Sequence, residues 1–126
     1  MVKEDVSDGY RLIEALEKKD FQVTAALWLY EEEKRLWRLI IASPYYDEKG
    51  PREAYLFIAN IIEDLSLAPE LDLFNITVVS KNDRRILNLN NAIKVRDNPS
   101  GVRFSRSYID DAYIDDALIY RSGSEN

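Results

Sequence analysis

The chain has 126 residues, the usual length of one domain, and a formal net charge of −6 at pH 7. It contains neither cysteine nor histidine. This excludes disulfides, thiolate chemistry and every reaction that needs an imidazole as its base or as its metal ligand. No leader follows Met1 and no apolar run approaches the roughly 20 residues of a membrane span, so we expect a soluble cytoplasmic protein without a membrane partner.

The first expected element is a helix over about residues 4–19. Apolar side chains recur at helical spacing at Val6, Tyr10, Ile13 and Leu16. Lys18 and Lys19 stand in the last turn, where cations interact favourably with the helix dipole. The stripe predicts that this helix packs on a sheet.

The stretch 21–43 predicts a β-hairpin with a charged turn at residues 31–34. Both faces of each strand are mostly apolar, whereas a pair with one solvated face alternates apolar and polar residues more strictly. We therefore expect the hairpin to be covered on both sides, by helices, a second sheet or another subunit. Trp28 and Trp37 are expected to pair across the two strands as packing residues rather than as a ligand platform.

Residues 43–51 contain two prolines and a glycine and are expected to form a loop. Gly50-Pro51 predicts the start of a second helix, which Pro69 ends. A helix start exposes backbone N–H groups, so Arg52, with Tyr45 and Tyr46 as a wall, is a candidate anion site. The alternative is that the segment simply begins a helix.

The second half of the chain predicts a third strand at 71–79, a short helix at 82–92, and strands at 102–108 and 113–120. Residues 122–126 are expected to be a disordered tail after a single domain, 1–121. The element order is α-β-β-α-β-α-β-β. It predicts an α+β fold with a mainly antiparallel sheet of about five strands, on which two longer helices and one short helix pack.

Basic residues concentrate between 81 and 106, where seven of them accompany two acidic ones. If they converge, the arginines of this block form a candidate site for phosphate or nucleic acid. The candidate residues are Arg84, Arg85, Arg96, Arg103 and Arg106. The alternative is that they pair with the acidic excess elsewhere, in the same chain or across a dimer. Arg84 and Arg85 open the short helix, at the end where the dipole disfavours cations.

The tandem repeat YIDDA-YIDDA spans residues 108–117. In one straight strand it would place aspartates on both faces, so we expect a turn at Asp110-Asp111 between two strands. Oxygen ligands suit Mg²⁺ or Ca²⁺, yet the spacing does not match an EF-hand loop and the stretch lacks the glycine of that loop, so we assign neither a metal nor a cofactor.

The sequence does not establish a function, and three hypotheses follow from it. The first is an interaction or regulatory protein that acts through its surface, as a homodimer or with another protein. The second is a binding module for nucleic acid or a phosphate ligand that uses block 81–106, and nucleic acid is the less favoured partner because the chain is acidic. The third is a carboxylate- and Mg²⁺-dependent enzyme, ranked last because no catalytic motif occurs.

Overall fold

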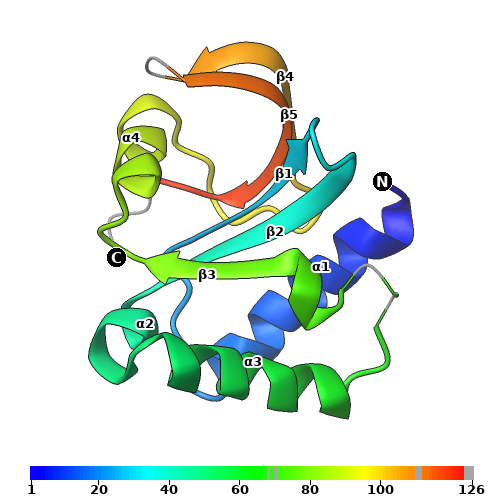
Figure 1. Ribbon diagram of the computed structural model, residues 1–126, viewed down its shortest axis with the longest axis vertical. Helices are drawn as coiled ribbons and strands as arrows, with labels where there is room; N and C mark the ends of the chain where they lie inside the picture. The colour runs from blue at the N-terminus through cyan, green and yellow to red at the C-terminus, as the bar shows by residue number, and fades with distance from the viewer. Residues whose placement is uncertain (68, 70, 110–111, 124–126) are drawn as a thin grey trace.

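The computed structural model describes residues 1–67, 69, 71–109 and 112–123, and in it one five-stranded sheet carries helices on both faces (Figure 1). The helices are α1 (Lys3–Lys18), α2 (Pro44–Lys49), α3 (Pro51–Asp64) and α4 (Arg84–Ala92), with one 3₁₀ turn, η1 (Leu73–Asn75). The strands are β1 (Ala25–Glu31), β2 (Leu36–Ser43), β3 (Ile76–Ser80), β4 (Val102–Ile109) and β5 (Ala112–Arg121). None of these helices is both long and apolar enough to cross a membrane.

The sheet has the order β3-β2-β1-β5-β4. All neighbouring strands run antiparallel except β2 and β3, which are parallel. The expected α+β fold, its element order and its mainly antiparallel sheet are therefore confirmed. The parallel pair arises because α2 and α3 carry the chain from the end of β2 back to the start of β3.

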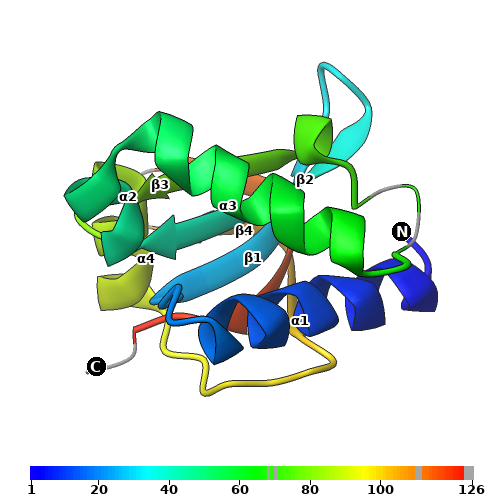
Figure 2. The ribbon, with the colours of Figure 1, turned by 90° about the horizontal axis from the view of Figure 1, so that it is seen from below.

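One face of the sheet is covered by α1 and α3, which lie side by side across it (Figure 2). Leu12 and Leu16 of α1 and Ile58 of α3 are fully buried there against Leu39 and Ile41 of β2. The apolar stripe predicted for α1 and the buried side of α3 therefore pack into the larger of the two clusters that form the core.

The second face is covered by α4, which lies on the other side of the sheet from α1 and α3 (Figure 1). Ile86 and Leu89 of α4 pack with Leu27, Ile40 and Ile119 of the three central strands. The prediction that both faces of the hairpin are buried is confirmed, and elements of the same chain cover both.

The register of the hairpin overturns the expected tryptophan pair. Trp28 lies opposite Leu39, and Trp37 lies opposite Tyr30, because the four-residue loop 32–35 fixes the pairing around Glu31 and Leu36. Trp28 is fully buried and donates its indole N–H to the Tyr120 hydroxyl at 2.8 Å. Trp28 is therefore a packing residue, as predicted, but its partner is Tyr120 rather than Trp37.

The segment 43–51 was expected to be a loop, and this was wrong: residues 44–49 form helix α2. The Ser43 hydroxyl accepts a hydrogen bond from the Tyr45 N–H at 3.1 Å, and Pro44 occupies the first helical position. Gly50, at φ +89°, then ends α2 and precedes α3, as Gly50-Pro51 predicted. Ser-Pro and Gly are helix start and stop signals, and here they enclose a single short helix.

Three predicted boundaries also change. α3 ends at Asp64 rather than at Pro69, because the chain leaves the helix to bury Leu71 in the core. The third strand begins at Ile76, after Asp72 accepts the Phe74 N–H at 2.8 Å and turns the backbone into η1. The short helix begins at 84 rather than 82, because the Asp83 carboxylate caps it.

The chain is held in place beyond the expected end of the domain at residue 121. Ser122 is buried and forms a backbone bridge with Val95, with both N–H···O distances at 3.0 Å. The Gly123 N–H donates to the Asn90 side-chain oxygen at 2.8 Å. The predicted tail therefore cannot begin at Ser122, and its residues 124–126 lie outside the described part of the chain.

Candidate functional site

An open groove of about 510 Å³ lies between α4 and the hairpin that β4 and β5 form. Thirteen of the described residues line it, and nine of these are apolar. The apolar residues come from the sheet, from α4 and from the hairpin: Leu27, Leu29, Ile40, Ile86, Leu89, Ile109, Ala112, Ile114 and Ala117. A cavity of this size and character falls in the range of small-ligand sites.

A change of face along the β4–β5 hairpin provides one wall of the groove. In a regular strand, residues an odd number apart point to opposite faces. Ile114 and Ile119 of β5 are five apart, as are Phe104 and Ile109 of β4, yet all four pack on the α4 side of the sheet. Each strand therefore reverses its faces midway, near Arg106, whose φ of +50° is rare for a residue with a side chain. Figure 1 shows the hairpin curving toward α4.

The four polar residues of the groove all belong to one short stretch: Asp83, Arg84, Arg85 and Asn88. The Asp83 carboxylate accepts the backbone N–H groups of Arg85 at 2.9 Å and Ile86 at 3.4 Å, which fixes the start of α4. It also lies 3.6 Å from the guanidinium of Arg85. Arg84 is exposed and makes no ion pair with any residue that the structure describes. The polar lining that the structure describes therefore comes from the cap and first half of α4, whereas the apolar lining comes from the strands and from α4.

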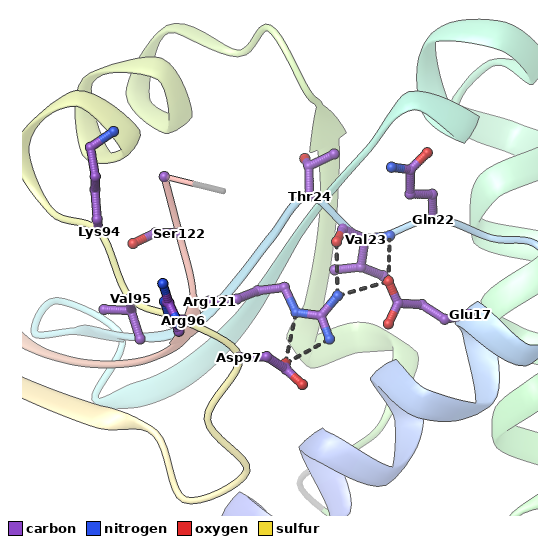
Figure 3. Close-up of a pocket in the computed structure, with 11 residues that line it drawn as sticks. Glu17, Gln22, Val23, Thr24, Lys94, Val95, Arg96, Asp97, Arg121 and Ser122 are labelled. Atoms are coloured by element: carbon purple, nitrogen blue, oxygen red, sulfur yellow. Dashed lines mark hydrogen bonds and ion pairs between the residues drawn. The ribbon is translucent and has the colours of Figure 1, made fainter. Parts of the chain in front are cut away.

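A second cavity, of about 840 Å³, is polar and lies around Arg121, at the end of β5. Figure 3 shows the Arg121 guanidinium between the carboxylates of Glu17 and Asp97, at 2.7 Å from each. Arg121 also donates to the Val23 carbonyl at 3.0 Å. This side chain joins α1, the strand entry at Val23 and the segment after α4, so its donors are already used in holding the fold together.

Asp97 is shared with a second partner in the same network. It accepts a hydrogen bond from the Tyr10 hydroxyl of α1, and this bond is the main cause that raises the pKa of Tyr10 to about 12. Lys94 and Arg96 also line the cavity and make no ion pair within the described part of the chain. The cavity thus combines an internally paired centre, one arginine between two carboxylates, with two exposed cations at its border.

A third cavity, of about 580 Å³, contains Arg103 and Arg106. Arg103 donates to both carboxylate oxygens of Asp116, at 2.6 and 2.5 Å, and its guanidinium lies 5.3 Å from the centre of the Trp37 ring. The hydrogen bond from Arg103 is the main cause that holds the pKa of Asp116 below its ordinary value. Arg103 therefore pairs with an acidic residue of the neighbouring strand, as the alternative reading of the basic block anticipated.

The five candidate arginines line three different cavities. Arg84 and Arg85 lie at the apolar groove, Arg96 at the polar cavity, and Arg103 and Arg106 at the third. No single site built from block 81–106 results, because α4 and the connection to β4 separate residues that are close in sequence.

The candidates before β3 lie away from these three cavities. Tyr45 stacks on Phe21 at 4.8 Å between ring centres and also contacts Phe57, and Tyr46 packs against the same core. Arg52 is exposed in the first turn of α3. None of the three lines any of the cavities described above.

The acidic repeat, residues 108–117, is shared between strands β4 and β5. β4 ends at Ile109 and β5 begins at Ala112, with these two residues paired, so the two strands that flank the predicted turn are confirmed. Asp110 and Asp111 themselves lie outside the described residues. Among the residues that are described, no three His, Cys, Asp or Glu side chains gather where they could hold a metal ion.

The groove itself was missed from the sequence, although Arg84 and Arg85 were singled out. Their position at the unfavourable end of a helix was the one local signal of a site. The apolar wall gave no signal, because Ile109 and Ile114 reach it only through the change of face in the hairpin. Comparisons with protein-family models, with curated proteins and with solved structures find no match to this chain.

Proposed function

We propose that this chain is a binding domain that acts through its surface, and that the groove between α4 and the β4–β5 hairpin is its principal binding site. One observation carries the proposal: nine apolar side chains from three parts of the fold line an open groove. Covering apolar surface contributes roughly 25 cal/mol per Å², so an apolar partner gains affinity there without any catalytic group.

The other two cavities support a binding role less well. Arg121 and Arg103 are already bound by carboxylates of the same chain, at 2.7 and 2.5 Å. A ligand would have to displace these charge-assisted hydrogen bonds, and breaking such a pair leaves a charge without its partner. Arg96 and Arg106 make no ion pair among the described residues, but they line cavities in which a neighbouring arginine is already paired. We therefore assign the phosphate-binding alternative to Arg84 and Arg85, which open onto the apolar groove.

The groove can be tested with N-phenylnaphthylamine, a neutral apolar dye that fluoresces in apolar surroundings. We expect saturable binding to the wild-type chain at one site. Ala112→Trp, which places a large side chain over the groove, should weaken binding at least tenfold, and so should Ile114→Glu. Tyr113→Glu is the matched control, because Tyr113 neighbours both positions, is 53% exposed and does not line the groove.

Urea unfolding of each variant separates a lost site from a lost fold. Equal dye binding in all four proteins, or none in the wild type, would refute the proposed site. Sedimentation equilibrium of the same samples tests whether the chain forms the homodimer expected from its sequence. If the wild type is dimeric and Ile114→Glu is monomeric, the groove is occupied by a second copy of the chain.

A further inference from the structure

We infer that the groove binds a free single-chain amphiphile with an anionic head, such as a medium-chain fatty acid, with its carboxylate at Arg84 and Arg85. The inference rests on the proposed function and adds the chemical class of the ligand. It follows from three properties of the groove: its division into an apolar and a charged part, the sign of that charge, and its size.

The first property is the separation of polar and apolar lining. Nine apolar residues come from β1, β2, β4, β5 and α4, whereas all four polar residues lie within residues 83–88. A wholly apolar ligand would leave the charged part without a partner, and a polar ligand would cover the apolar part poorly. A molecule with one polar head and one apolar chain satisfies both parts together.

The second property is the sign of the charge. Arg84 and Arg85 are both exposed, and the Arg85 side chain is 71% exposed. Among the lining residues that the structure describes, the one acidic side chain is that of Asp83, which already accepts two backbone N–H groups and lies beside Arg85. Because the positive end of the α4 dipole adds to the two arginines, an anionic head is favoured over a cationic one.

The third property is size. The groove measures about 510 Å³ and is lined by thirteen residues. Small-ligand sites occupy roughly 300–1,000 Å³, whereas a stable protein interface uses about 20–30 residues on each side. The groove therefore fits one acyl chain better than a folded partner, and the two chains of a membrane phospholipid would compete for the same space.

Competition against N-phenylnaphthylamine tests the inference, with every amphiphile kept below the concentration at which it forms micelles. We expect decanoate to displace the dye at a concentration at least tenfold lower than decyltrimethylammonium does. From octanoate to dodecanoate, each added methylene should tighten binding about fourfold until the groove is filled. Phosphatidylglycerol vesicles should not bring the protein down on centrifugation, because their lipids carry two chains.

The double variant Arg84→Gln/Arg85→Gln should bind decanoate at least tenfold more weakly, while its binding of the neutral dye should fall by a much smaller factor. Lys94→Gln/Arg96→Gln is the matched control, since it removes the same charge at the polar cavity and should leave decanoate binding unchanged. Equal displacement by the anion and the cation, no dependence on chain length, or full decanoate binding by the first variant would each overturn the inference. Dye binding with any of these results would leave the proposed function standing, whereas absence of dye binding would remove both.

Discussion

At the scale of single residues, the presence or absence of a neighbouring carboxylate decides whether an arginine is available to bind a ligand. Arg103 lies opposite Leu118 on β5, yet its side chain reaches Asp116 and forms a bidentate ion pair with it. Arg84 has no such neighbour among the described residues. Two arginines of the same basic block therefore differ in availability: one holds a hairpin together, and the other faces a groove.

The Arg103–Asp116 pair predicts a specific dependence of stability on pH. Since the folded-state pKa of Asp116 lies below its ordinary value of 3.8, the pair stabilises the fold fully above about pH 5 and is lost as the pH falls through the folded-state pKa. Asp116→Asn should lower the free energy of unfolding at pH 7 by less than about 1 kcal/mol, because Arg103 is 55% exposed. The difference from the wild type should shrink below pH 4.

Urea unfolding at pH 7, 5, 4 and 3 measures this difference directly. Glu33→Gln is the control, because Glu33 is an exposed residue of the β1–β2 turn without an ion pair in the described part of the chain. The free energy of unfolding of Glu33→Gln should differ from that of the wild type by the same amount at all four pH values. A gap between Asp116→Asn and the wild type that widens in acid would contradict the predicted sign.

At the scale of elements, helix α1 packs tightly on the sheet at Gly9. A Cβ atom at this position would lie 2.4 Å from the Tyr120 hydroxyl oxygen and 3.1 Å from the Trp28 indole nitrogen. Tyr120 is fully buried; its hydroxyl donates to the Val6 carbonyl at 2.5 Å and accepts from Trp28 at 2.8 Å. The hydroxyl cannot move aside without losing these two hydrogen bonds.

We therefore predict that Gly9→Ala destabilises the protein, although alanine is the better helix former by about 1 kcal/mol. Overpacking of this kind costs roughly 1–3 kcal/mol, measurable as a lower urea midpoint with an unchanged slope. In a Tyr120→Phe background the same substitution should cost less, because the clashing oxygen is gone. A Gly9→Ala protein as stable as the wild type would show that α1 can shift outward freely.

The elements also show what can be predicted from the sequence. The β1–β2 hairpin and helices α1 and α3 were predicted because their apolar spacing is local and repeats over many residues. Helix α2 was missed because prolines and a glycine indicate helix ends and loops equally well. The groove could not be predicted, because its walls meet only through the reversed faces of β4 and β5 and the placement of α4, which depend on tertiary packing.

At the scale of the whole molecule, the two faces of the sheet are covered unequally. Helices of 16 and 14 residues cover the first face, whereas a single helix of nine residues and the curved hairpin cover the second. A short helix cannot close the surface that five strands present, and the space left beside it is the groove. The candidate site therefore follows from the architecture rather than from a sequence motif.

Residues 122 and 123 hold the end of α4 and the segment after it in place, and these contacts predict where the domain ends. Ser122 exchanges two backbone hydrogen bonds with Val95 and donates its hydroxyl to the Ile93 carbonyl at 2.8 Å, and Gly123 binds Asn90 near the end of α4. A chain that stops after Arg121 should lose about 1–3 kcal/mol, because the buried carbonyls and the N–H of the segment after α4 lose their partners. If the predicted tail is confined to residues 124–126, a chain that stops after Gly123 should match the 126-residue chain.

Urea unfolding of the two truncated chains and the 126-residue chain, with amide hydrogen exchange over residues 89–95, distinguishes local loosening of α4 from a general loss of stability. In the shorter truncation, exchange should quicken most at Val95 and at the C-terminal end of α4, while the amides of α3 keep their relative protection. Since α4 forms one wall of the groove, the same truncation should also weaken dye binding. Equal unfolding midpoints for all three chains would place the end of the domain at Arg121 and leave α4 held by its apolar face alone.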